Sequence, residues 1–233
     1  MSDLRVVEAD GGEANNVTSL SEHSVTSFSW SPDGAQFVYA TSEWDLWIIG
    51  GDGIGRQRIT DDEAQQNFPA WSPDGSSIVY EQIPVVDRMV SGDSDLWVSS
   101  PDGSNPRQLT GTGSATEPAW SPDGTLIAFV SYVFADQAPG DHSDVWVMGA
   151  DGSGQRNVSN EPTRFDNSPA WSPDGTRIVF HSAGPIRFWE DPELGEIYGH
   201  DPAADIFVIS ADGGPRTQLT FGDHSEAAPS LRP

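Results

Sequence analysis

The 233-residue chain contains no cysteine and no lysine. Without cysteine it has no thiol nucleophile, disulfide, Cys-ligated zinc or iron–sulfur site, and its redox compartment stays open. Without lysine it has no Schiff-base amine and no P-loop lysine. The sequence also lacks a Gly-x-Ser-x-Gly elbow, a His-Glu-x-x-His motif and a glycine-rich phosphate loop before a helix. These absences exclude the compact catalytic motifs that are easiest to find in a sequence.

Positive charge is scarce. Eleven arginines stand against 36 Asp and Glu residues, which gives a formal net charge of −25. Nucleic acids and anionic membranes repel such a chain, so neither is an expected partner. A Lys-free, Asp-rich surface suits a halophilic protein in a high-salt cytoplasm, and a GC-rich genome that replaces Lys by Arg is the alternative explanation.

Long hydrophobic runs are also missing. No window approaches 18 apolar residues, and the start of the chain, Met1 to Arg5, carries no apolar leader segment. We therefore expect a soluble chain without a membrane span or secretory signal. Localisation stays open: the cytoplasm is favoured, and a trimmed start would allow a periplasmic or extracellular protein.

A repeated motif organises what is present. Trp-Ser-Pro-Asp-Gly begins at Trp30, Trp71, Trp120 and Trp171. Each copy is followed by an alternating apolar run, a second run that begins with Asp, and a short third run that ends in Thr or Ser. Strands divided by such turns, repeated about every 40 to 50 residues, are typical of propeller blades. We expect an all-β propeller of four-stranded antiparallel blades, with full blades at 28–60, 68–110, 118–159 and 169–220.

The two ends of the chain fit the same register. Residues 1–20 match the outer hairpin of a blade, and residues 227–233 match an innermost strand, with Pro229-Ser230-Leu231 in place of Pro-Ala-Trp. Together they would form a fifth, closing blade that lacks one strand, within a single domain covering 1–233. Two alternatives stay open: another chain supplies the strand, or the polypeptide is a fragment of a larger ring.

This repeat resembles the TolB-type, WD40-like β-propeller family. The family's units carry Pro-x-Trp-Ser-Pro-Asp-Gly, then Asp-Ile/Leu-aromatic-Val and Asp-Gly. Four copies, the last three with the leading proline, cover nearly the whole chain. The resemblance implies a β-propeller. It does not imply one function, because these repeats occur in periplasmic interaction proteins, peptidase-associated propellers and some lyases.

The two sides of such a propeller differ in their variability. The Ser-Pro-Asp-Gly and Asp-Gly turns lie on one side, the turn face, while the links between second and third strands and between blades lie on the other, the loop face. Length variation falls on the loop face, at 83–93, 131–143 and 181–204. Because variable loops on a rigid scaffold commonly bind ligands, we expect a non-catalytic binding or scaffold propeller that recognises a protein or small ligand there. The alternatives are a metal-assisted hydrolase or lyase on the same face, and an assembly unit that completes its ring with another chain.

Candidate ligand-binding residues are cationic or aromatic loop-face residues. Arginines would hold a carboxylate or phosphate, and exposed aromatic rings would anchor a partner. For Trp189 the alternative is that it packs the longest loop onto the ring. The candidates are Arg88, Arg164, Arg187, Trp189 and Tyr198.

Candidate metal ligands are all the histidines and one Asp per blade. The histidines fall in loop-face segments and would form a metal or general-base site if they converge, or else are scattered polar residues. The strand-leading aspartates would form a carboxylate ring that suits a divalent cation, calcium before others, or each satisfies local loop amides. The residues are His23, His142, His181, His200, His224, Asp45, Asp95, Asp144 and Asp205.

The remaining motif residues are interpreted as structural. The tryptophans are expected in the core between sheets: Trp30, Trp47, Trp71, Trp97, Trp120, Trp146 and Trp171. Arginines of the outermost strands are expected to discourage edge pairing: Arg56, Arg58, Arg107, Arg156 and Arg216.

Overall fold

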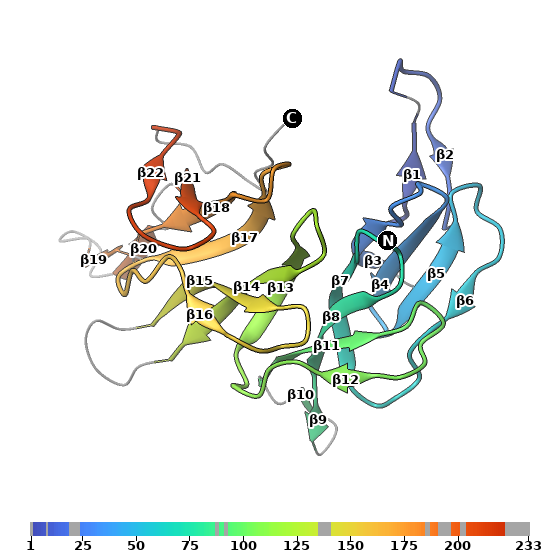
Figure 1. Cartoon of the computed structure of the whole chain (residues 1–233), viewed down its shortest axis with the longest axis horizontal. Helices are drawn as coiled ribbons and strands as arrows, with labels where there is room; N and C mark the ends of the chain where they lie inside the picture. The colour runs from blue at the N-terminus through green and yellow to red at the C-terminus, as the bar shows by residue number, and fades with distance from the viewer. Residues whose placement is uncertain are drawn as a thin grey trace. The chain divides into compact units, whose positions relative to one another are not determined.

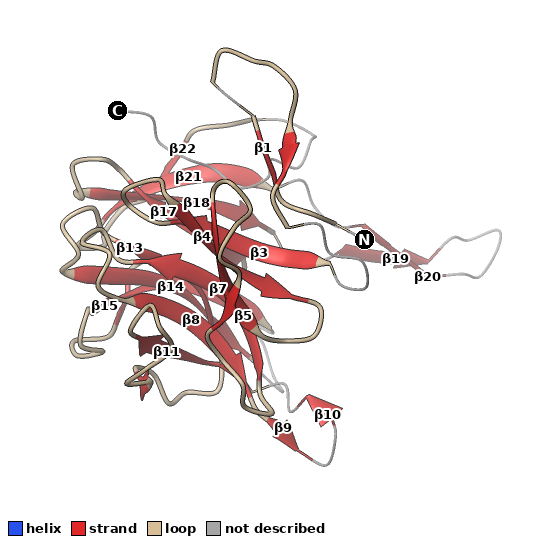
Figure 2. Ribbon diagram, turned by 90° about the vertical axis from the view of Figure 1, so that its right-hand side faces the viewer, coloured by secondary structure: helices blue, strands red, loops and turns tan. Residues whose placement is uncertain are grey.

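A computed structural model of the chain describes residues 2–7, 9–18, 24–86, 89–90, 93–134, 141–184, 187–190, 197–200 and 204–221. At 86, 89–90, 187–190 and 197–200 it describes the backbone only. All regular structure in these ranges is β-strand, as Figure 2 shows. None of the described segments is a helix long and apolar enough to cross a membrane. The chain divides into two compact units, Met1–Trp120 and Ser121–Pro233.

The first unit holds a hairpin and two four-stranded antiparallel sheets (Figure 1). The hairpin is β1 (Arg5–Val6) with β2 (Asn15–Asn16). The first blade has the order β3 (Val25–Trp30), β4 (Gln36–Thr41), β5 (Leu46–Gly50), β6 (Gln57–Arg58). The second blade has the order β7 (Gln65–Trp71), β8 (Ile78–Ile83), β11 (Asp95–Ser99), β12 (Arg107–Gln108). Strand β13 (Ala115–Trp120) ends the unit.

The second unit continues the same strand pattern. It begins with β14 (Leu126–Val133), β15 (His142–Gly149) and β16 (Arg156–Asn157). The last blade has the order β17 (Phe165–Trp171), β18 (Arg177–Ala183), β21 (Asp205–Ser210), β22 (Thr217–Gln218). The predicted all-β fold of four-stranded antiparallel blades is thus confirmed. Residues 222–233 lie outside the described residues, so the closing blade, the count of five and the blade boundaries stay predictions.

Two predicted loops contain short hairpins. In the second blade β9 (Val85–Val86) pairs with β10 (Met89–Val90), and Figure 1 shows this hairpin extending beyond the sheet. In the last blade β19 (Arg187–Glu190) pairs with β20 (Ile197–His200). Both hairpins lie between the second and third strands of their blades, so they extend the loop face and leave the turn face unchanged.

The Ser-Pro-Asp-Gly turns explain why each first strand ends where it does. In the first blade the Ser31 hydroxyl donates to Asp33 (2.6 Å), the Ala35 amide donates to Asp33 (3.0 Å), and the Gln36 amide donates to Ser31 Oγ (2.9 Å). Gly34 takes the left-handed conformation, with φ of 70°, which costs glycine little. The same bonds recur at Asp74, Asp123 and Asp174. The hydrogen bond from the serine is the main reason that the pKa values of all four aspartates are lowered.

The core lies between neighbouring blades. In the first unit Val38, Leu46 and Ile59 of the first blade pack with Trp71 and Tyr80 of the second. Trp71 and Trp171 are buried as predicted, but Trp30 is 42% exposed, which corrects its assignment to the core. Its ring lies on Phe37 of its own blade, with 3.6 Å between centroids. By the repeat register, the innermost strand of the neighbouring blade on this side of Trp30 would be residues 227–233, which lie outside the described residues.

Candidate functional site

The strand-leading aspartates tie the third and fourth strands of each blade together. Asp95 accepts hydrogen bonds from Thr110 Oγ1 (2.8 Å), Gln108 Nε2 (3.1 Å) and the Thr112 amide (3.0 Å). The Leu96 amide in turn donates to Thr110 Oγ1 (2.9 Å). Each group therefore satisfies another near a strand end, which favours the structural interpretation of this aspartate.

The other copies of this arrangement differ in their donors, and in the first blade the Thr60 hydroxyl donates to Gln66 Oε1 instead (3.0 Å). Asp144 accepts from Asn157 Nδ2 (2.8 Å), and Asp205 accepts from Gln218 Nε2 (2.7 Å). Asp45 instead accepts from the Arg58 guanidinium, with 2.8 Å between Nη2 and Oδ1. Among the described residues, no group of three or more His, Asp or Glu side chains is placed to hold a metal ion. Calcium binding stays a prediction.

The histidines are described only in part. His142 is buried in β15, and its Nε2 lies 3.7 Å from Asp144 Oδ2. His181 lies in β18, opposite Asn167 and Ile206 in the strand register. His200 lies in β20, where only the backbone is described, and His23 and His224 lie outside the described residues.

The structure also describes only some of the predicted ligand-binding arginines and aromatic residues. Arg164 donates to Ser182 twice, from Nε to Oγ (2.7 Å) and from Nη2 to the carbonyl oxygen (2.8 Å), so its guanidinium is engaged within the last blade. In the β19–β20 register Trp189 is opposite Tyr198, and Arg187 is opposite His200. Arg88 lies outside the described residues.

Sequence reasoning missed the role of Arg216. Instead of protecting an edge, its guanidinium pairs with Glu161 (3.1 Å) and with the fully buried Asp166 (3.3 Å). Burial raises the pKa of Asp166, while hydrogen bonds and Arg216 oppose that shift. The sequence contains no signal for this pairing, because the two residues are brought together only by the packing of the last two repeats.

A pocket opens on the loop face of the first unit, with a volume of about 620 Å³. Its walls come from the turn between β4 and β5, from Arg58 of β6, from the link between the first two blades, and from Val85 of β9. The lining residues are Glu43, Trp44, Asp45, Arg58, Asp62, Glu63, Ala64 and Val85. Among them, sequence reasoning had named only Asp45, as a candidate metal ligand, and Arg58, as an outermost-strand residue.

The first blade departs from the repeat at two of these residues. The position before the strand-leading aspartate is Ser94, Ser143 or Ala204 in the other blades, all buried, whereas here it is Trp44, which is 38% exposed. The residue that bonds the strand-leading aspartate is Gln or Asn in the other blades and Arg58 here. Both departures line the same pocket, and a comparison of the repeat copies would have revealed them.

Trp44 is held in an unusual backbone conformation. Its φ is 80°, a left-handed value that is rare for a bulky side chain and costs on the order of 1 to 3 kcal/mol. Its amide donates to the Thr41 carbonyl (2.9 Å), and its carbonyl accepts from the Gln66 amide (2.8 Å). The blades on both sides of the link therefore fix this residue at the pocket.

Comparison with known proteins agrees with this architecture. A family model described as the TolB beta propeller domain matches residues 2–134, more than half of the chain. The chain belongs to the TolB β-propeller family. Among curated proteins, none matches the chain by sequence.

Solved structures show the fold of this TolB-family chain. It is similar to a putative TolB from Agrobacterium tumefaciens, with a TM-score of 0.71 and 21% identity over 94% of this chain and 74% of that one. It is also similar to TolB from Acinetobacter baumannii, with a TM-score of 0.61 and 16% identity over 96% of this chain and 60% of that one. An oligogalacturonate lyase from Vibrio parahaemolyticus is similar with a TM-score of 0.60 and 14% identity over 93% of this chain and 70% of that one. At these identities the likeness concerns the fold alone.

Proposed function

We propose that this chain is a non-catalytic binding propeller whose loop face recognises a small ligand or a side chain of a protein partner. The observation that carries the proposal is the pocket beside Trp44, where two departures from an otherwise regular repeat meet. A repeat keeps residues that build the blade, so residues that break it at one pocket are candidates for recognition.

The turn face offers a contrast. Its Ser-Pro-Asp-Gly turns use the same serine, aspartate and amide bonds in every copy, so their polar side chains serve the turn itself. On the loop face the β19–β20 hairpin is a second candidate surface, since Arg187, Trp189 and Tyr198 all belong to it. The lyase alternative has no comparable support, because its likeness to this chain is one of fold.

The experiment screens the full chain against cationic, anionic and neutral small molecules and short peptides, by calorimetric titration. We expect Trp44→Ala to weaken binding of the strongest binder about tenfold or more. The matched control is Ile54→Ala, which removes an apolar side chain that is 72% exposed beside the Asp-Gly turn of the same blade. Binding lost in Ile54→Ala and unchanged in Trp44→Ala, Arg187→Ala and Trp189→Ala would contradict the assignment to the loop face.

A further inference from the structure

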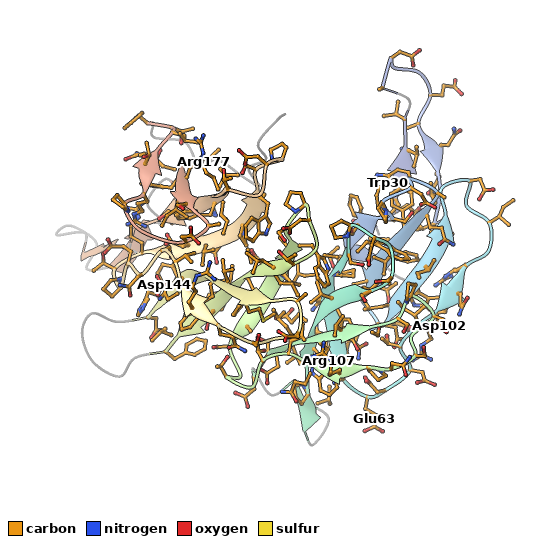
Figure 3. The ribbon with its side chains drawn as sticks, viewed as in Figure 1. Trp30, Glu63, Asp102, Arg107, Asp144 and Arg177 are labelled. Carbon is orange, nitrogen blue, oxygen red and sulfur yellow. The ribbon has the colours of Figure 1, made fainter. Side chains whose placement is uncertain are left out.

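The pocket beside Trp44 has a marked excess of negative charge. Four carboxylates line it, those of Glu43, Asp45, Asp62 and Glu63, against the single guanidinium of Arg58. That guanidinium is paired with Asp45 at 2.8 Å, so the only cation in the wall is already neutralised. Glu63 is exposed, and Figure 3 shows its side chain pointing outward from the ribbon.

Trp44 adds an aromatic surface to this charge. Trp44 lines the pocket, and the residue as a whole is 38% exposed. The face of an indole attracts cations more strongly than that of any other side chain. Elsewhere in the same blade Arg56 lies over Trp47, at 4.0 Å from the ring centroid. Among the described residues no arginine takes the corresponding place on Trp44.

We propose that this pocket binds an organic cation, an alkylammonium or guanidinium group, which stacks on Trp44 and pairs with Glu63 and the neighbouring carboxylates. This inference rests on the proposed function and names its ligand class. The cation belongs either to a free amine or to a lysine or arginine side chain of a protein partner.

The chemistry of the pocket favours an organic cation over other ligands. A metal ion such as calcium needs six to eight oxygen ligands converging at about 2.3 to 2.6 Å, and the described carboxylates form no such group. An anion would be repelled by the lining carboxylates. A weakly hydrated cation with an extended surface matches both the indole and the dispersed carboxylates.

The test follows the indole signal of Trp44 by NMR in the full chain with labelled tryptophan, assigned by its loss in Trp44→Phe. The probes are N-acetyl-lysine methylamide, N-acetyl-arginine methylamide and a lysine- and arginine-containing hexapeptide. The neutral probes are N-acetyl-norleucine methylamide and methyl glucoside. We expect the cationic probes alone to shift this signal saturably, and less strongly at 0.5 M than at 0.05 M sodium chloride because salt screens exposed charges. Much tighter binding of the hexapeptide than of the single residues would identify a protein partner as the source.

Variants separate a local site from general charge attraction. Calorimetric titration compares the variants, because Trp44→Ala lacks the observed indole signal. Trp44→Ala should weaken binding of the cationic probes about tenfold, and Glu63→Gln about threefold. Glu13→Gln, which removes one exposed carboxylate outside the pocket, should leave it unchanged. Glu63→Gln keeps the test valid if Trp44→Ala fails to fold.

Three outcomes would overturn the inference. One is a saturable shift of Trp44 by the neutral probes as large as that by the cations, which would leave the proposed loop-face function intact. Another is equal weakening by Glu63→Gln and Glu13→Gln, which would show unspecific attraction. The third is the absence of any shift of Trp44 by the cationic probes. The proposed function itself fails separately, when binding maps to Ile54 instead.

Discussion

At the scale of single residues, Glu81 is a buried carboxyl group within the second blade. Burial raises its pKa from 4.5 to about 6, although Thr116, Ser94 and Asn67 donate hydrogen bonds to it. The folded state therefore favours protonated Glu81. The stability that this provides is fully present below pH 4.5 and is lost as the pH rises through about 6.

Glu81→Gln should remove the loss of stability that accompanies ionisation of Glu81 at high pH. We expect the variant to be more stable than the parent at pH 8 by about 2 kcal/mol, with the difference shrinking toward zero near pH 4.5. Urea unfolding across this range measures it, and Glu13→Gln serves as the exposed control. Parallel stability curves for Glu81→Gln and the parent would show that Glu81 titrates normally in the fold.

Gly103 shows how closely the first two blades approach. It lies in an Asp-Gly turn with φ of +82°, and an added Cβ would come within 2.1 Å of the Ile59 carbonyl oxygen. Gly55 has a similar φ of +76° but open space around its Cβ position. Both alanine variants therefore strain the backbone, and only one causes a steric clash.

We expect Gly55→Ala to lower the free energy of unfolding by about 1 kcal/mol and Gly103→Ala by about 2 to 4 kcal/mol. Denaturant titration of both variants gives the comparison directly. If the two losses were equal, the close approach of the Gly103 turn to Ile59 would be wrong.

At the scale of elements, the Ser-Pro-Asp-Gly turn sets the pKa of its own aspartate. The Ser172 hydroxyl is the main cause that lowers the pKa of Asp174 from 3.8 to about 2, followed by the Thr176 amide. Since the lowered pKa belongs to the folded state, this turn stabilises the fold above pH 3.8 and loses that effect as the pH falls toward 2.

Ser172→Ala should move the pKa of Asp174 back toward 3.8 and lower the melting temperature at neutral pH, because the carboxylate loses its strongest donor. Carboxyl NMR titration measures the first effect. Asp123 in the preceding turn is the internal control and should not change. An unaltered Asp174 titration in Ser172→Ala would refute this role of the serine.

The turns and blades were predictable because their causes are local. Proline presets φ at Pro32, Asp33 accepts from its own turn, and Gly34 takes the left-handed conformation, so the motif dictates the structure wherever it recurs. The repetition of Asp95 in every blade favours its structural alternative, and its hydrogen bonds lie within one repeat. Hydrogen bonds of this kind depend on residues within one repeat.

The pocket was not predictable in the same way. Trp44 and Glu63 are brought to one site by the link that joins two blades, and the burial of Glu81 depends on packing against the next inner strand. The exposure of Trp30 shows the reverse case, in which a residue assigned to the core by its motif is left partly open. Such properties arise between repeats, where no local pattern records them.

At the scale of the whole molecule, the net charge of −25 opposes a compact fold. Monovalent salt shortens the screening length from about 10 Å at 0.1 M to about 3 Å at 1 M. We therefore expect the melting temperature to rise clearly between these concentrations. Scanning calorimetry in sodium chloride tests this, and a melting temperature that stays flat up to about 3 M would contradict the halophilic interpretation and leave genome composition to explain the missing lysine.

The most direct test of the binding role is a crystal structure of the full chain soaked with N-acetyl-arginine methylamide. The account predicts its guanidinium group against the Trp44 indole, within hydrogen-bonding distance of carboxylates from the pocket wall. Density for the probe beside the Ser-Pro-Asp-Gly turns, with the pocket at Trp44 empty at a saturating probe concentration, would contradict it.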